Sequence, residues 1–411
     1  MDKSGIIEGK PAPAGKEELA PYPKRYRWVM LSLLWLLYAA FGLAVRSIAP
    51  LVTPILEDLH LSYTQMGLIL GSWQLTYILV SLIAGTMIDR WGVRKSLFAG
   101  TLIVGLSLAL RYLPKGFAGM LGAVALLGAG GPMISIGAPK TISIWFEGKS
   151  RGAAIGIYLT GPWIGGILAL TLTNSLVMPL TGHHWRSTFL LYSLFAFMAA
   201  MLWSFLARDT GPSTVPVDTG FANVFKRLIK VRNVLIVVIL GLLTFAVTHG
   251  FNNWLPKILE ASGLSPERAG FTSSLPLAAG VPSLLIIPRL VPAHWRGRYL
   301  ALAPMLILVS LILSMMTSGA IQLASLALFG VLIAPFVPIL TLILMDSPEV
   351  GSAYMGTAGG LFFCVAEIGG VMGPLIMGTV VDLTGTFLAG TVFFALLCVI
   401  TSVLTLRLKI K

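Results

Sequence analysis

The sequence predicts an all-α integral membrane protein with twelve spanning helices. Hydrophobic residues make up 56% of the 411-residue chain and charged residues only 11%, whereas about a quarter of a soluble domain is charged. Apolar runs of roughly 20 residues, the length that crosses a bilayer, recur along the whole chain. These runs are too long for membrane strands and do not alternate as such strands do. We therefore expect the lipid bilayer to be the solvent of this chain.

The twelve spans fall into two groups of six. Several exceed the ~20 residues that a span needs, which implies tilt or protrusion. A long polar connection separates span six from span seven. We expect a cytoplasmic tail at 1–25, a six-helix bundle at 26–208, a cytoplasmic linker at 209–232 and a second six-helix bundle at 233–408. The predicted spans are 28–56, 64–88, 96–113, 117–146, 152–180, 187–207, 233–256, 267–289, 299–317, 320–346, 352–380 and 386–407.

Basic residues predict the orientation, because cytoplasmic loops are rich in Lys and Arg. With both termini cytoplasmic, 22 of the 29 Lys and Arg residues lie on the cytoplasmic side. The net charge of +13 is then a topology signal, and its spread over short loops argues against nucleic-acid binding. The N-terminal tail lacks the apolar core of a signal peptide. We expect a multi-pass monomer in the inner (plasma) membrane. The remaining basic residues are Arg111, Lys115, Arg186, Lys257 and Arg268 outside, with Arg46 and Lys140 within spans.

The sequence offers no sign of a cofactor. Cys364 and Cys398 both lie in late spans, so neither a disulfide framework nor a metal cluster is indicated. Nucleotide-binding and metalloprotease motifs are missing from the sequence. A receptor or a membrane enzyme is the rival class, but the chain contains no catalytic cluster. We therefore expect no cofactor, no metal and no enzymatic activity.

The two halves repeat each other. The stretch "ILEDLHLSYTQMG" (Ile55–Gly67) aligns with "ILEASGLSPERAG" (Ile258–Gly270) at an offset of 203 residues. Both stretches end the first span of their half. Such duplication is typical of secondary transporters, whose substrate site lies near the membrane midplane between the repeats.

The loop "GTMIDRWGVRK" after the second span resembles the GxxxDRxGxRK loop of the major facilitator superfamily, and the resemblance covers about 25–408. Two stretches of the second half look like the cyanate-permease-like branch, and "WFEGKSRGAAIGI" after span four is similar to the organic anion symporters. The resemblance implies that this loop latches the two halves in the outward-facing state, with Glu147 as a candidate partner of its basic residues. The loop after span eight keeps three arginines but lacks the aspartate. The predicted latch residues are Gly85, Asp89, Arg90, Gly92, Arg94 and Lys95.

Arg46 is the main candidate for substrate binding. It lies 11 residues before Glu57, where span one ends, so it should sit ~16 Å below the outer surface. A charge near mid-bilayer is a functional-site hypothesis by default, and the arginine fork suits a carboxylate. A structural ion pair with Glu367, the acid that we place mid-span, is the alternative reading.

The repeat places His249 opposite Arg46, since the offset of 203 residues relates the two positions. We expect an anion to bind between them, with Asn252 and Asn253 donating hydrogen bonds from the same face of the helix as His249. A lone histidine in a helix can equally be a packing residue. Three further candidates are open to other readings, namely Gln74 and Tyr77, which can be packing residues, and Lys140, which can reach the cytoplasmic interface.

Glu367 is the first candidate for proton coupling, and His249 is the second. Glu367 lies 15 residues from Ser352 and from Asp382, the polar ends of its span. A carboxyl group at such a depth is a plausible proton carrier. It can also neutralise Arg46 or support a glycine-rich helix contact, so the sequence leaves these alternatives open.

These observations predict a secondary active transporter that moves a small, monocarboxylate-like organic anion by alternating access. Proton symport is the simplest coupling, since an anion moving inward needs a cation to offset the membrane potential. The alternative is an exporter of drug-like or amphipathic compounds by proton antiport. The stretch "GIYLTGPWIGG" (Gly156–Gly166) supports this alternative, because it is similar to the GPxxGG motif of drug/proton antiporters.

Overall fold

The structure is a computed structural model that describes residues 25–208 and 228–408. The side chains at 149 and 351–356 are outside that description. The predicted tail, apart from its last residue, and most of the predicted linker at 209–232 also lie outside the described residues.

The described helices include twelve that are long and apolar enough to cross a membrane, which confirms the predicted fold class. Their boundaries lie within a few residues of the predicted spans. In the first half the elements are α1 (Tyr26–Arg46), η1 (Ala49–Leu51), α2 (Val52–Leu59), α3 (Tyr63–Trp91), α4 (Val93–Leu110), α5 (Phe117–Ala125), α6 (Leu127–Trp145), α7 (Gly148–Leu172), η2 (Thr173–Val177), α8 (Met178–Leu180) and α9 (Trp185–Leu206).

The second half is built in the same way from helices that run back and forth. Its elements are α11 (Arg232–Ala261), α12 (Pro266–Leu290), α13 (Ala293–Met316), α14 (Gly319–Ile333), α15 (Phe336–Asp346), α16 (Gly351–Thr384) and α17 (Phe387–Thr405).

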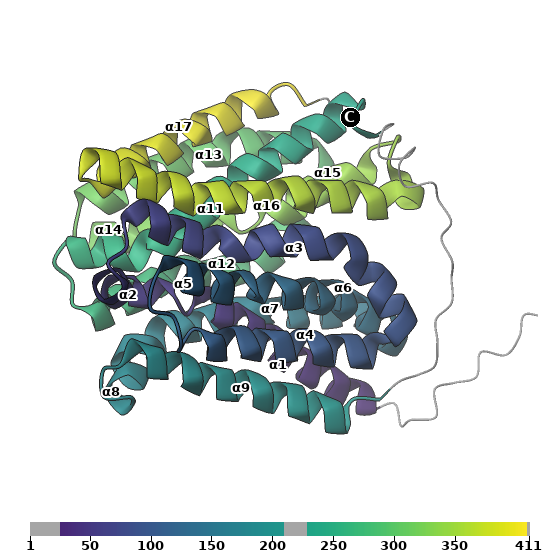
Figure 1. The fold of residues 1–411 in the computed structure, drawn as a ribbon. Helices are drawn as coiled ribbons and strands as arrows, with labels where there is room; N and C mark the ends of the chain where they lie inside the picture. Colours follow the sequence, from purple (N-terminus) through teal and green to yellow (C-terminus); the bar gives the residue numbers. More distant parts are fainter. Residues whose placement is uncertain (1–24, 209–227, 409–411) are drawn as a thin grey trace, which may run out of the picture.

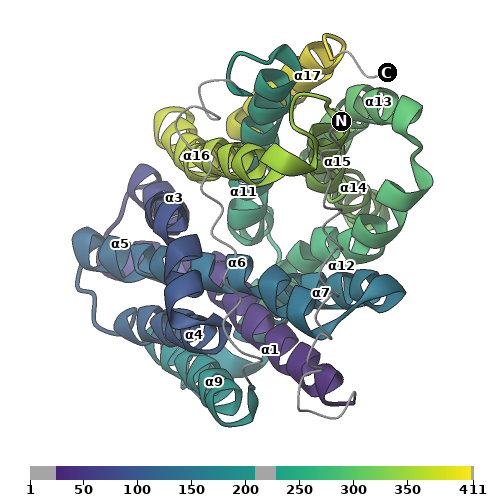
Figure 2. The ribbon, with the colours of Figure 1, turned by 90° about the vertical axis from the view of Figure 1, so that its right-hand side faces the viewer.

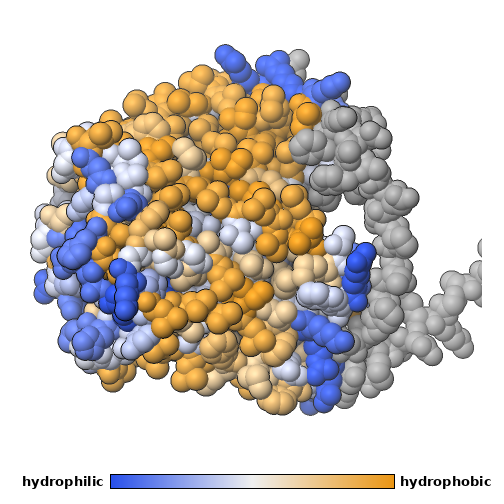
Figure 3. Space-filling view, in the orientation of Figure 1, coloured by the Kyte–Doolittle hydropathy of each residue, from blue (hydrophilic) through white to orange (hydrophobic). Residues whose placement is uncertain are grey.

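The two halves form separate bundles that lie side by side. Figure 1 shows the first half mostly below and the second half mostly above, with α12 at the level of the first-half helices and most helices roughly parallel. The end-on view of Figure 2 separates the same two groups, with α3 beside α16 and α7 beside α12 at their junction. Apolar residues form a broad band across the middle of the surface, while hydrophilic residues gather at the two ends (Figure 3). We call these the Tyr26 end, where α1 begins, and the Glu57 end, where α2 lies.

Glycines bring α3 and α16 into backbone contact across the two bundles. A Cβ atom at Gly67 would stand 2.3 Å from the Pro374 carbonyl oxygen, and one at Gly378 would stand 2.1 Å from that of Tyr63. No larger residue fits at these positions without moving a helix. Small residues are the usual means by which membrane helices approach closely, so this contact fixes how the halves meet.

Two prolines break the first span. Pro50 has no N–H to donate to the carbonyl of Arg46, and Pro54 has none for the carbonyl of Pro50. Helix α1 therefore stops at Arg46, a 3₁₀ turn follows, and α2 begins at Val52. The freed Pro50 carbonyl accepts a hydrogen bond from Asn174 Nδ2 (3.1 Å), which also donates to the Pro266 carbonyl of the second half (3.2 Å).

Hydrogen bonds join the halves at the Glu57 end. Asp382 of α16 accepts from the backbone N–H groups of Tyr63 (3.0 Å) and Thr64 (2.7 Å) and from Thr64 Oγ1 (2.6 Å). Those N–H groups begin α3, so the carboxylate also meets the positive end of the helix dipole. Nearby, Thr53 of the first half donates to Glu260 of the second. The Glu57 end is thus closed in this structure.

We predict that Asp382→Asn loosens the Glu57 end, since the amide is neutral and offers fewer lone pairs to the start of α3. Labelling of a cysteine at Thr379, in a chain with Cys364 and Cys398 replaced by alanine, should become about fivefold faster. Thr384→Ala is the matched control, because the hydrogen bonds of Thr384 stay within its own turn. Equal labelling rates in both variants would show that Asp382 does not hold this end.

Candidate functional site

Arg46 sits at the last position of α1 and points toward the second bundle. Its Nη1 donates to Asn253 Oδ1 of α11 at 2.6 Å. Its stem lies against α7, where a Cβ atom at Gly166 would be 3.0 Å from Arg46 Cγ. The Arg46 side chain is partly buried, and no described carboxylate forms an ion pair with it. The guanidinium is therefore held by one neutral acceptor and keeps further N–H groups for a ligand.

A second contact joins the halves through His249. Gln74 Nε2 of α3 donates to His249 Nδ1 of α11 at 3.3 Å, since the amide nitrogen can only donate and Nδ1 must therefore be the acceptor. The rings of Trp73 and Phe245 flank the imidazole at centroid distances of 6.2 and 5.4 Å. The sequence repeat pairs His249 with Arg46, but the side chain that contacts Arg46 is Asn253, one turn further along α11.

Buried acceptor oxygens without a partner lie on the helices that carry these two contacts and on α16. Among the described residues, Gln74 Oε1, Asn252 Oδ1 and Glu367 Oε2 have no hydrogen bond, and these side chains are at most 6% exposed. A Cβ atom at Gly370 would be 2.8 Å from Gln74 Nε2 and 3.1 Å from Glu367 Oε2. Gln74 and Glu367 therefore meet at the same place from opposite halves. Leaving buried acceptors unpaired is costly, so these oxygens favour a ligand that brings donors.

The structure does not contain the Arg46–Glu367 ion pair that the sequence left open as an alternative. The Arg46 head bonds Asn253, and the described cations form no ion pair with Glu367. Tyr77, another candidate, shares a 2.7 Å hydrogen bond with Ser135 of α6 inside the first bundle. Tyr77 therefore braces α3 against α6 rather than bridging the halves.

Lys140 contacts the loop rather than the Arg46 region. Its Nζ lies 2.6 Å from Asp89 Oδ1 at the Tyr26 end. The sequence left open whether Lys140 meets an anion or reaches the cytoplasmic interface. Lys140 forms an ion pair with Asp89, and the two side chains are 25% and 65% exposed.

The other loop residues have separate roles. Gly92 joins α3 to α4 with a φ of 79°, a value that favours glycine. Arg94 Nη2 donates to the Ser204 carbonyl near the end of α9 at 2.5 Å. A Cβ atom at Gly85 would meet nothing within 4 Å. The predicted partnership of Glu147 is not formed, since the described residues make no ion pair with Glu147, Arg90 or Lys95.

The corresponding loop of the second half has an ion pair of its own. Arg296, after α12, pairs with Asp346 at the end of α15. This loop lacks the aspartate, as the sequence indicates. Its ion pair has the opposite polarity, because the first loop supplies the acid to Lys140 whereas the second loop supplies the base to Asp346.

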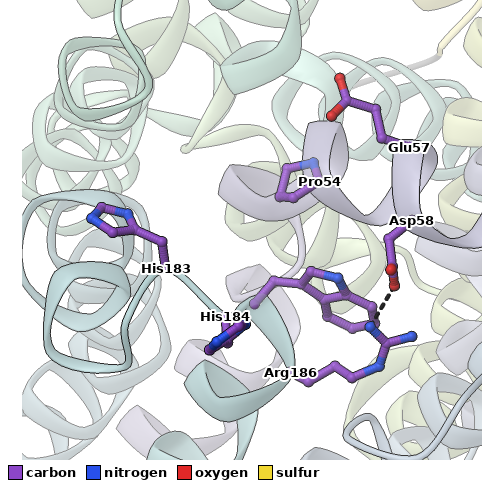
Figure 4. Close-up of a pocket in the computed structure, with 7 residues that line it drawn as sticks. Pro54, Glu57, Asp58, His183, His184 and Arg186 are labelled. Carbon is purple, nitrogen blue, oxygen red and sulfur yellow. Dashed lines mark ion pairs between the residues drawn. The ribbon is translucent and has the colours of Figure 1, made fainter.

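A pocket of about 420 Å³ opens at the Glu57 end, apart from these residues (Figure 4). In the figure Arg186 reaches Asp58, with which it forms an ion pair, while His183 points away from both. The pocket contains none of the predicted site residues. Its lining is Pro54, Glu57, Asp58, His183, His184, Trp185 and Arg186.

Two polar residues of the first half, Arg111 and Asn174, were not identified from the sequence as candidates. Arg111 follows an apolar span and was assigned to an outer loop, yet its side chain is fully buried. No pattern in the sequence distinguishes it from a loop arginine. Asn174 is different, because an amide inside the apolar run of span five is a visible signal. It lies in a π-helical turn, Thr173–Val177, which no periodicity predicted.

Comparisons with known proteins agree with this architecture. The family model described as "Major Facilitator Superfamily" matches residues 34–374. The chain is 24% identical to the hexuronate transporter of Bacillus subtilis, covering 88% of this chain and 90% of that protein. It is 26% identical to the 2-nitroimidazole transporter of Escherichia coli over 63% of this chain and 65% of that one.

Among solved structures, the chain resembles a bacterial homologue of the human lysosomal transporter Spinster. The TM-score is 0.75 at 17% identity, over 94% of this chain and 96% of the other. At this identity the likeness concerns the fold alone.

We predict that Arg46 is coupled energetically to Asn253 and not to Glu367. In unfolding measurements, the effects of Arg46→Ala and Asn253→Ala should be non-additive by ~0.5–3 kcal/mol, because they remove the two ends of one hydrogen bond. The effects of Arg46→Ala and Glu367→Gln should add within ~0.5 kcal/mol. Recovery of stability when Glu367→Gln is added to Arg46→Ala would instead reveal a hidden ion pair.

Proposed function

Because this chain belongs to the Major Facilitator Superfamily, we propose that it is a secondary active transporter that moves a small organic anion by alternating access. It is a multi-pass membrane transporter rather than an enzyme. We further propose an inner-membrane location with both termini in the cytoplasm, which places the Tyr26 end inside. The distribution of basic residues supports that orientation.

The observation that carries the proposal is the contact between Arg46 and Asn253. It brings a permanent cation to the junction of the two bundles, where a transporter of this build holds its substrate. Only one Arg46 donor is paired with a described residue, so the guanidinium can offer further N–H groups to a carboxylate. The relative named as a hexuronate transporter supports an organic anion as the substrate.

The unpaired acceptors refine the substrate class. A plain monocarboxylate brings only acceptors, which would satisfy Arg46 but not Gln74 Oε1, Asn252 Oδ1 or Glu367 Oε2. A hydroxylated acid brings a carboxylate for Arg46 and O–H donors for those oxygens. We therefore propose a hydroxylated organic anion, within the broader expectation of a monocarboxylate-like substrate.

A drug-like substrate is the second candidate, supported by the relative named as a 2-nitroimidazole transporter and by Pro162 with its neighbouring glycines. A thermal-shift panel of purified protein separates the candidates, since a ligand stabilises the state that it binds. The panel contains galacturonate, hexanoate and 2-nitroimidazole. Stabilisation by galacturonate but not hexanoate supports the hydroxylated anion, whereas stabilisation by 2-nitroimidazole alone favours the second candidate.

We predict that Arg46→Lys weakens galacturonate binding by about tenfold to a hundredfold, because lysine keeps the charge but cannot donate two parallel hydrogen bonds. Isothermal titration calorimetry of the folded variant gives the affinity. Arg407→Lys is the matched control, since Arg407 is exposed after the end of α17 and is neither a predicted latch residue nor a predicted site residue. Unchanged affinity in Arg46→Lys would remove Arg46 from the substrate site.

Proton coupling through Glu367 is part of the proposal, with His249 as the alternative carrier. Glu367 is 6% exposed and has no ionic partner among the described residues. An unpaired carboxylate so deeply buried is costly, so this group is suited to taking up and releasing a proton during the cycle. Glu367 also lies at the junction of the two halves, because its carboxylate and the Gln74 amide approach each other beside Gly370.

We predict that Glu367→Gln retains substrate exchange but loses accumulation driven by a proton gradient, because the amide mimics the protonated acid permanently. Uptake into proteoliposomes, with and without a protonophore, measures both activities. Glu349→Gln, an exposed position, is the matched control. Accumulation that follows sodium and ignores the proton gradient would exclude both Glu367 and His249 as carriers.

We also propose that the Asp89 loop controls conformation rather than binding substrate. Its ion pair with Lys140 and the reversed pair Arg296–Asp346 lie at the Tyr26 end. The Glu57 end is closed by Asp382 and its partners, so the Tyr26 end is the one whose opening gives access to the site in this conformation.

A further inference from the structure

Arg111 is a buried cation in the first bundle. It follows α4, is 0% exposed and forms no ion pair with a described carboxylate. Its Nη2 donates to Ser107 Oγ at 3.3 Å, and its Cζ lies 5.4 Å from the centre of the Phe189 ring. Burying an arginine without a counter-ion costs free energy. We therefore expect the other contacts of Arg111 to do more than fill space.

Those contacts lie on both sides of Arg46 along the chain. Arg111 Nη1 donates to the Ala44 carbonyl and to Ser47 Oγ, each at 3.0 Å. Ser47 Oγ itself donates to the Ala44 carbonyl at 2.9 Å. The guanidinium therefore fixes the backbone two residues before Arg46 and the side chain one residue after it.

Arg111 contacts the end of α1, where the helix cannot supply donors to its own last carbonyls. The last carbonyls of any helix lack intrahelical donors, and Pro50 removes a donor that a continuous span would have supplied. A cation at the C-terminal end also meets the negative end of the helix dipole favourably. A hydrocarbon side chain of equal size would fill the space but could not bond the carbonyl of Ala44.

We propose that Arg111 is a positioning residue for substrate binding, which holds the end of α1 so that Arg46 is presented to the anion. Arg111 does not touch the substrate in this account. The inference rests on the proposed function of Arg46, and it adds the residue that follows α4 to a site formed by α1, α3, α11 and α16.

The test uses Ser47→Ala in the full-length protein, because this variant removes one anchor of Arg111 and leaves the buried charge in place. Galacturonate affinity, measured by calorimetry on folded protein, should fall about threefold to tenfold. Ser193→Ala is the matched control, since Ser193 Oγ bonds only the Leu190 carbonyl of its own helix. Arg111→Lys, if it folds, should weaken binding further, because one ammonium cannot span Ala44, Ser47 and Ser107.

A purely structural role predicts something else. Ser47→Ala would then lower the melting temperature but leave the affinity of the folded protein equal to that of Ser193→Ala, which would overturn the inference while Arg46→Lys still lost binding. If the wild-type protein binds no organic anion, the proposed function and this inference fail together. Loss of affinity in Ser47→Ala with a melting temperature near that of the control is the expected result.

Discussion

A permanent cation at the junction of two bundles is the constraint on which the rest of this structure depends. Arg46 cannot shed its charge under ordinary conditions, and within the described residues it has an amide oxygen rather than a carboxylate as its partner. The features around Arg46 accommodate its side chain and fix its position. Gly166 leaves room for its stem, Pro50 ends the helix behind it, and Arg111 ties down the backbone on which it stands.

The two bundles meet along α3 and α16 and along α7 and α12. The seam between α3 and α16 is built from glycine and backbone rather than from interlocking large side chains. Close backbone contact gives short distances without strong adhesion, because few polar bonds cross the seam outside the Glu57 end. A transporter that must separate one end while closing the other needs such a seam. Near its centre Gln74 and Glu367 lie beside Gly370, and each keeps an oxygen that has no hydrogen bond among the described residues.

Hydropathy alone predicted the twelve spans well, because lipid forces every buried backbone group into a helix. It also led to Arg46, His249 and Glu367, since charge within an apolar run is conspicuous. The contact partners of these side chains were harder to predict. The offset between repeats matched Arg46 with His249, whereas the residue that contacts Arg46 is Asn253, one helical turn further along α11. Lys140 and Asp89 lie 51 residues apart, and Arg111 is enclosed by the end of α1 and by Phe189 of α9. Such pairings depend on how helices pack, which the period of one helix does not encode.

Asn174 gives the Glu57 end a property of a different kind. One amide nitrogen donates to carbonyls of both halves, at Pro50 and at Pro266, and Pro54 ensures that the first carbonyl has no helical donor to fall back on. Asn174 and Pro50 both belong to the first half, so a separation of the halves would break the bond to Pro266 but not the bond to Pro50. The Pro50 carbonyl would then keep its donor while the joint opens, which avoids the ~1–3 kcal/mol penalty of an unpaired buried acceptor. The break in the first span is thus satisfied from within its own bundle, whichever way the halves move.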